Sequence, residues 1–138
     1  MSPMLLDTHV WLWFAEGMSA KLSARSVRSI DKARRDAGLL VSAISVWELG
    51  MQVAKGRVQL SAPLNIWVRR AIQAPGIKLV PLDSETALES TELPGELHAD
   101  PADRFLIATA RVLNASLATR DEQIIEYGES GFLRVLKV

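Results

Sequence analysis

The stretch MLLDTHVWLWFAE, residues 4–16, places a short apolar run, an acidic residue and an amphipathic segment in direct succession. The apolar run Met4–Leu6 predicts a buried strand that ends at Asp7. Residues 8–15 are rich in bulky apolar side chains, which predicts a short helix, and Gly17 predicts the end of that helix. The stretch therefore indicates a strand followed at once by a helix, with a carboxylate at the junction.

The rest of the chain repeats this alternation of short apolar runs and longer amphipathic segments. Further strands are predicted at about 39–41, 77–80, 116–118 and 132–137. Helices are predicted at about 20–36, 63–73, 83–91, 101–114 and 121–127, with another that begins at Ser42 or Ser45 and runs to about Ala54. Strands that alternate with helices are typical of a parallel sheet, and right-handed crossovers cover both of its faces. We therefore predict an α/β fold, a three-layer α/β/α sandwich.

Length and composition limit the class of protein. The 138 residues fit a single domain, 1–138, and the absence of cysteine excludes disulfides and thiolate metal sites. We expect no signal peptide, because the apolar residues 4–14 contain Asp7 and His9 and lack a basic start. We expect no membrane span, because no apolar run approaches about 20 residues, and we therefore expect a cytoplasmic protein. The formal net charge is zero, so composition neither indicates nor excludes a nucleic-acid partner.

Four acidic residues fall where ligands gather in open α/β sheets, beyond the carboxyl ends of the strands. Asp7 and Asp121 each follow a strand, while Glu48 and Asp103 lie near the starts of helices. Each has an ordinary explanation: helix capping for Asp7 and Asp121, a capping box with Ser45 for Glu48, and the helix dipole for Asp103. Those explanations do not account for four carboxylates at one sheet edge.

Carboxylates that meet in this way repel one another, so either some of them stay protonated or a hard cation neutralises them. Two unit charges about 5 Å apart repel by roughly 3 kcal/mol at an effective dielectric constant near 20. Ligand sets made only of oxygen favour Mg²⁺ or Mn²⁺, which activate water and stabilise charge on a phosphate. The sequence contains no Walker A, dinucleotide-binding, nucleophile-elbow or zinc-protease motif. The pattern therefore favours hydrolysis of a phosphodiester by metal-activated water.

Four segments in this order resemble the motifs of PIN-domain ribonucleases, specifically VapC-type toxins of type II (VapBC) toxin–antitoxin systems. The segments are LLDTHVWLW (5–13), VSAISVWEL (41–49), HADPADRFLIA (98–108) and LATRD (117–121). The resemblance implies a five-stranded parallel sheet of order 3-2-1-4-5. It also implies Mg²⁺- or Mn²⁺-dependent endoribonuclease activity, with tRNA or rRNA as substrate.

The same resemblance assigns roles to residues and partners. The catalytic and metal-binding acids it implies are Asp7, Glu48, Asp103 and Asp121. Asp103 is preferred over Asp100 because it stands four residues before Ile107, and Asp100 would assist through water. A small VapB-like antitoxin that pushes a side chain into the active site is implied as partner, together with a homodimer.

Other residues have predicted supporting roles. The hydroxyl of Thr8 or Thr119 would orient a carboxylate or phosphate, and Arg104 would contact phosphate or pair with a neighbouring acid. A path for RNA would be lined by basic residues, unless these form only a solvated face: Lys55, Arg57, Arg69, Arg70 and Arg120. Aromatic residues near the first and third helices would form a groove for an antitoxin helix: Trp11, Trp13, Phe14, Trp47 and Trp67.

Two alternatives remain open at this point. One is a non-catalytic PIN-fold module that only binds a partner. The other is a PIN nuclease that acts on RNA or DNA outside a toxin–antitoxin system. Bound Mg²⁺ or Mn²⁺ and an RNA cleavage assay would distinguish them.

Overall fold

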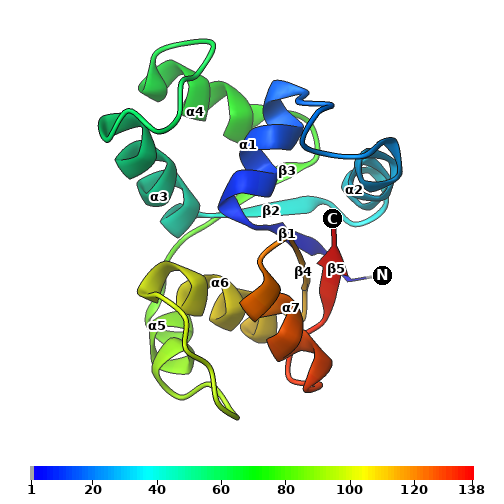
Figure 1. The fold of residues 1–138 in the computed structure, drawn as a ribbon, viewed down its shortest axis with the longest axis vertical. Helices are drawn as coiled ribbons and strands as arrows, with labels where there is room; N and C mark the ends of the chain where they lie inside the picture. The colour runs from blue at the N-terminus through cyan, green and yellow to red at the C-terminus, as the bar shows by residue number, and fades with distance from the viewer. Residues whose placement is uncertain (1) are drawn as a thin grey trace.

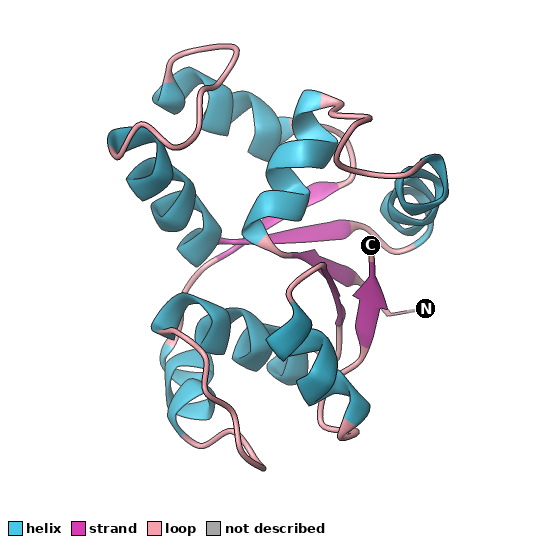
Figure 2. Ribbon diagram, in the orientation of Figure 1, coloured by secondary structure: helices cyan, strands magenta, loops and turns pink. Residues whose placement is uncertain are grey.

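The computed structural model describes residues 2–138, in which strands and helices alternate as the sequence predicts (Figures 1 and 2). The strands are β1 (Met4–Leu6), β2 (Leu39–Ser42), β3 (Ile77–Val80), β4 (Ser116–Thr119) and β5 (Val135–Lys137). The helices are α1 (Thr8–Glu16), α2 (Ala24–Asp36), α3 (Ala43–Ala54), α4 (Leu64–Gln73), α5 (Ser84–Thr91), α6 (Pro101–Val112) and α7 (Glu122–Glu129). No helix in residues 2–138 combines the length and the apolar composition that a membrane span requires.

The five strands form one parallel sheet of order β3-β2-β1-β4-β5, which confirms the predicted topology. The central strand β1 is fully buried, and its neighbours are β2 on one side and β4 on the other. The chain leaves β1 in one direction to build β2 and β3 and later returns to build β4 and β5. This reversal places a crevice beyond the carboxyl end of β1.

Strand periodicity divides the core into two layers. Successive side chains of a strand point to opposite faces. Accordingly, Leu5 packs in one cluster with α6 and α7, whereas Met4 and Leu6 pack in the other, with α1 and α4. In Figure 1, α1 to α4 cover one face of the sheet and α5 to α7 cover the other. The apolar runs of the three inner strands, β1, β2 and β4, are therefore covered on both faces, whereas the edge strands β3 and β5 are partly exposed.

Helix starts are set by capping side chains. Ser42 caps α3 by accepting a hydrogen bond from the amide of Ile44 at 3.1 Å, which decides between the two predicted caps, Ser42 and Ser45. Ser23 caps α2, so that helix begins at residue 24 and not at about 20. The last strand begins only at Val135, because a turn with Gly131 at φ +90° follows α7 and Leu133 packs into the core.

Asp83 provides a test of such a cap. Its side chain accepts a hydrogen bond from the amide of Thr86 at 2.8 Å, at the start of the helix α5 that packs against α6. Asp83→Ala is expected to lower the free energy of unfolding by about 1 kcal/mol, and Asp83→Asn, which still caps, by much less. Urea denaturation of the two variants measures the difference. An equal decrease in the free energy of unfolding in both variants would show that loss of the cap is not the cause of the destabilisation.

Candidate active site

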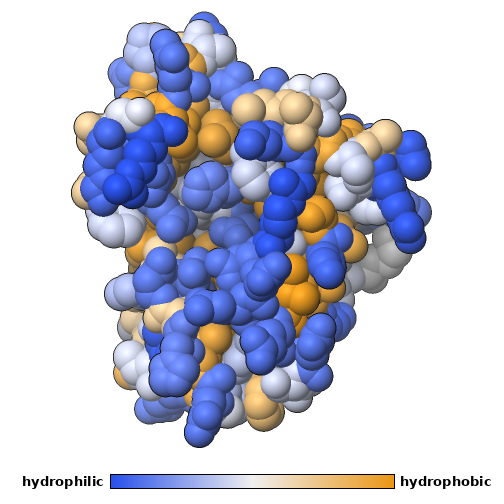
Figure 3. Space-filling view, viewed as in Figure 1, coloured by the Kyte–Doolittle hydropathy of each residue, from blue (hydrophilic) through white to orange (hydrophobic). Residues whose placement is uncertain are grey.

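The acidic cavity is lined by residues of α1, α3, α6 and α7 or of their N-caps, beyond the carboxyl ends of β1, β2 and β4. Figure 1 shows where these helices and strands lie in the fold. It has a volume of about 520 Å³. Its walls contain all four acids singled out in the sequence, and a fifth: Asp7, Glu48, Asp103, Asp121 and Asp100. The remaining lining residues are His9, Val10, Trp13, Gln52 and Arg120. Figure 3 shows hydrophilic side chains gathered across the middle of this face.

Asp7 is held at both of its carboxylate oxygens. Oδ1 accepts a hydrogen bond of 2.7 Å from the amide of Thr8 and so caps α1, while Oδ2 accepts one of 2.6 Å from the hydroxyl of Thr119. The same Thr119 oxygen accepts from the amide of Asp121 at 3.0 Å, and Thr119 is fully buried. The capping interpretation of Asp7 is thus correct, and it places the carboxylate at the cavity rather than away from it.

Glu48 is positioned by buried hydroxyls. The hydroxyl of Thr8 donates to Glu48 Oε1 and also lies 2.8 Å from the hydroxyl of Ser45. Because α3 begins after Ser42, Ser45 lies inside the helix and cannot form the predicted capping box with Glu48. Thr8, from the start of α1, therefore fixes a carboxylate of α3 across the crevice.

Asp100, Asp103 and Asp121 come from the other layer. Asp100 caps α6 by accepting from the amide of Asp103 at 2.9 Å, and Asp103 follows in the first turn. Asp121 caps α7 by accepting from the amides of Gln123 and Ile124. Pro101 at the first position of α6 fixes the backbone there, because its φ is already helical.

Burial and mutual repulsion disfavour the ionised carboxylates. Burial, followed by the charges of Asp100, Asp7, Asp121 and Glu48, raises the pKa of Asp103 to about 7. Burial likewise raises the pKa of Asp7, although the hydrogen bond from Thr119 opposes the increase. Burial also raises the pKa of Glu48, against the hydrogen bond from Thr8. The ionised form of Asp103 is therefore disfavoured near neutral pH unless a cation binds at the site.

The donor set fits a hard divalent cation. Glu48, Asp100 and Asp103 each offer a carboxylate oxygen, and these oxygens lie within 4.8 Å of one another. Asp7 and Asp121 line the same cavity. Oxygen-only ligands suit Mg²⁺ or Mn²⁺. Asp100, for which we predicted only an assisting role, belongs to this group of three.

Arg104 does not have the predicted role. Its guanidinium donates to the backbone carbonyls of Ser90 at 2.9 Å and Leu97 at 3.3 Å, and it does not line the acidic cavity. Consecutive residues of a helix project about 100° apart, so Arg104 faces α5 and the 92–100 loop when Asp103 faces the cavity. Arg104 thus fastens that loop and contacts neither phosphate nor an acid in this arrangement.

Gln52 and Ser45 belong to the site, although neither is predicted as a site residue from the sequence. Gln52 lies one helical turn after Glu48, on the same face of α3, and lines the cavity. The spacing of four residues is a signal that would have identified it. Ser45 has no comparable signal, because its contact with Thr8 spans 37 residues of sequence.

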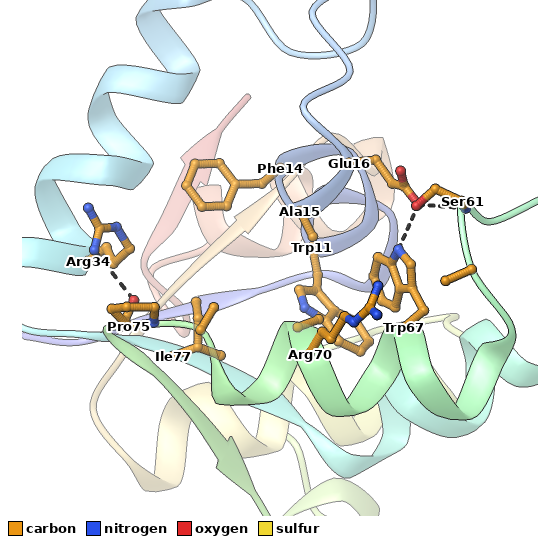
Figure 4. A pocket seen from close by; sticks show the side chains of 13 residues that line it. Trp11, Phe14, Ala15, Glu16, Arg34, Ser61, Trp67, Arg70, Pro75 and Ile77 are labelled. Carbon is orange, nitrogen blue, oxygen red and sulfur yellow. Dashed lines mark hydrogen bonds between the residues drawn. The ribbon is translucent and has the colours of Figure 1, made fainter.

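A second cavity, of about 430 Å³, lies between α1, α4 and the end of α2 (Figure 4). Trp11, Phe14 and Trp67 line it, with Trp11 and Trp67 in an edge-to-face pair at 5.2 Å. Glu16 Oε1 accepts from the indole of Trp67 at 2.6 Å and so joins α1 to α4. The predicted apolar groove is therefore formed by α1 with α4, not with α3, whose Trp47 is 58% exposed.

Comparisons with known proteins agree with this architecture. The family model for the PIN domain matches residues 4–130. Ribonuclease VapC22 of Mycobacterium tuberculosis is 32% identical over 124 residues, which cover 90% of this chain and 91% of that protein. VapBC2 from Rickettsia felis, bound to a promoter DNA fragment, aligns with a TM-score of 0.72 at 14% identity, over 97% of each chain. FitAcB from Neisseria gonorrhoeae aligns with a TM-score of 0.68 at 24% identity, over 97% of this chain and 96% of that one. The chain belongs to the PIN-domain family.

Proposed function

We propose that this protein is a Mg²⁺- or Mn²⁺-dependent endoribonuclease and the toxin of a type II toxin–antitoxin pair, acting in the cytoplasm. The observation that carries the proposal is the convergence of five carboxylates, from four helices, on one cavity. The similarity to a VapC ribonuclease over 90% of the chain supports RNA as the substrate. Within RNA, the class proposed is tRNA or rRNA. A non-catalytic module would have no need to bring together the partly buried carboxylates of Asp7, Glu48 and Asp103, whose pKa values are raised.

In this proposal Asp7, Glu48, Asp103 and Asp121 hold the cation, and Asp100 joins them from the first turn of α6. A bound divalent ion would lower the pKa of water and stabilise charge that develops on the scissile phosphate. The chain itself supplies orientation: Thr119 fixes Asp7, and Thr8 fixes Glu48. No side chain of the cavity needs to act as the nucleophile.

A cleavage assay with purified protein tests the activity. Total RNA is incubated with the protein and Mg²⁺, Mn²⁺ or EDTA, and the new 5′ ends are mapped. Cleavage at discrete sites that EDTA abolishes is the expected result. Binding of Mg²⁺ without cleavage of any RNA would contradict the nuclease, and cleavage of DNA alone would favour the DNA-directed alternative.

Thr119 tests whether orientation of Asp7 matters. Thr119→Val keeps the shape of the side chain but removes the hydroxyl that donates to Asp7 Oδ2. We expect cleavage to fall by about 10- to 100-fold, as for other hydrogen-bonding partners of metal ligands. Thr119→Ser keeps the hydroxyl and is expected to retain most activity. The measurement is the initial rate of RNA cleavage at saturating Mg²⁺. Equal rates in the two variants would refute the role of the Thr119 hydroxyl in orienting Asp7.

The groove between α1 and α4 is the proposed seat of an antitoxin segment. Half-buried Phe14 is the accessible aromatic of this lining, beside the buried rings of Trp11 and Trp67, and it suits contact with an apolar side chain of a partner helix. A homodimer is proposed as well, supported by the exposed Trp47 and Met51, which lie one turn apart on α3. Growth arrest on induced expression, relieved by the adjacent gene, tests the antitoxin. Sedimentation equilibrium tests the dimer.

A further inference from the structure

A third cavity of about 470 Å³, here called the side cavity, adjoins the acidic cavity. The two share His9 and Trp13, whose rings form the wall between them. We propose that the side cavity binds one nucleotide of a single-stranded RNA, next to the scissile phosphate. The inference rests on the proposed nuclease function and deepens it. The other lining residues are Leu12, Glu16, Met18, Lys21, Arg57, Val58 and Gln59.

Two cations at the side cavity suit phosphate. Lys21 and Arg57 are exposed and come from the loops after α1 and after α3. The ion pairs of residues 2–138 lie on α2 and between Arg111 and Glu89, so neither Lys21 nor Arg57 is neutralised by a carboxylate there. Glu16, the acid of this cavity, uses Oε1 to accept from Trp67 and Ser61. The lining of the side cavity thus has two formal positive charges and one negative charge, which leaves a net positive site beside the acidic one.

The dividing wall suits a nucleobase. His9 and Trp13 are one helical turn apart on α1, with ring centroids 5.8 Å apart. The guanidinium of Arg120 lies 4.7 Å from the centre of the Trp13 ring. Arg120 is itself fixed, because it donates to the backbone carbonyls of Lys21 and Val138. Bases stack on such rings with little sequence preference, so the wall provides affinity without base-specific contacts.

Size and shape favour a single unpaired nucleotide. The volume lies within the range of roughly 300–1,000 Å³ of small-ligand sites, and Leu12, Met18 and Val58 supply apolar surface. A base inside a duplex is stacked and paired, and cannot reach a pocket of this kind unless it is unstacked. The substrate chemistry expected here is therefore a loop or a single strand with its phosphate towards Lys21 and Arg57.

Binding of a fluorescent single-stranded RNA, measured by anisotropy in Mg²⁺, tests the proposal. All proteins carry Asp7→Asn to prevent cleavage. The Lys21→Ala, Arg57→Ala variant is expected to bind at least about tenfold more weakly than its parent. The logarithm of the association constant falls linearly with the logarithm of the salt concentration. The magnitude of that slope should be smaller by about 1.4 in the double variant, at about 0.7 for each lost phosphate contact. The matched control is Arg25→Ala, Arg28→Ala, which removes two exposed, unpaired charges of α2 and should bind like the parent.

Crosslinking locates the base. The same RNA with 4-thiouridine is irradiated, and crosslinked peptides are identified by mass spectrometry. Crosslinks are expected within 9–13 or 57–59, and their loss in Trp13→Leu supports the stacking wall. Crosslinks only elsewhere, or a double variant that binds like its control, would overturn the side cavity. Wild-type protein that binds RNA in this way but never cleaves it would refute the nuclease alone.

Discussion

Asp7→Asn is expected to lower the rate of RNA cleavage by on the order of 10²- to 10³-fold while the fold remains intact. The charge is what this change removes. Asparagine caps helices as well as aspartate does, so its Oδ1 can still accept from the amide of Thr8. Its amide nitrogen can donate to the Thr119 oxygen, reversing the bond that Asp7 accepts. The loss of activity would therefore report on the cation site and not on the start of α1.

The measurement is initial cleavage rate as a function of Mg²⁺ concentration, with circular dichroism to follow folding. Asp36→Asn is the matched control, because Asp36 is an exposed residue of α2 that pairs only with Lys32. That variant should cleave at the wild-type rate. An Asp7→Asn protein that keeps its Mg²⁺-dependent rate would refute the assignment of Asp7.

The stability of the metal-free protein is expected to fall as pH rises from about 5 to 8. Burial raises the pKa of Asp103 to about 7, and burial also raises the pKa of Asp7 and of Glu48. A raised pKa means that the folded state binds the proton more tightly than the unfolded state. The stability contributed by that proton is complete below the unfolded pKa, near 4, and is lost as pH passes through the folded value.

Asp103 alone should account for a loss of about 1–2 kcal/mol, after discounting for its partial exposure to solvent. The lowered pKa values of Asp31, Asp36 and Asp83 act in the opposite direction, but only near or below pH 4. Added Mg²⁺ should restore stability at pH 8 and have little effect at pH 5, where protons compete for the same oxygens.

Thermal unfolding with EDTA or Mg²⁺ at a series of pH values measures this dependence. Asp103→Asn is the informative variant, because it removes the carboxylate whose pKa is raised to about 7, first by burial and then by the neighbouring acids. We expect it to be more stable than the wild type at pH 8 in EDTA, by several degrees in Tm, and to gain less from Mg²⁺. A wild-type Tm in EDTA that does not change between pH 5 and 8 would contradict the raised pKa values of the carboxyl groups in the acidic cavity.

The strands, the helices and the acids that follow the strands could be predicted from the sequence, because they depend on patterns of neighbouring residues. Met4–Leu6 followed by Asp7 identifies the central strand and the acid beyond it, since parallel strands end at one edge. The same logic placed Glu48, Asp103 and Asp121 near that edge, and the structure brings them to one cavity. Their roles in catalysis and metal binding stay predictions that the experiments above test.

The predictions from the sequence were wrong where packing between distant segments decides which side chains face the cavity and which helices lie side by side. Asp100 was ranked second because Asp103 has the motif spacing of four residues to Ile107, yet Asp100, the cap of α6, also lines the cavity. Arg104 seemed close to phosphate because Asp103 precedes it, but helical rotation sends the two side chains in different directions. The aromatic groove was paired with the wrong helix, because nothing in α3 or α4 alone reveals which one packs beside Trp11.

The acidic cavity lies on the seam between the two halves of the core. Asp7 and Glu48 come from the layer of α1 and α3, whereas Asp100, Asp103 and Asp121 come from the layer of α6 and α7. A divalent ion held by both sets would cross-link the two layers through oxygen atoms. Local opening of either layer would then release the ion, so that loading with metal and integrity of the whole sheet become a single cooperative property.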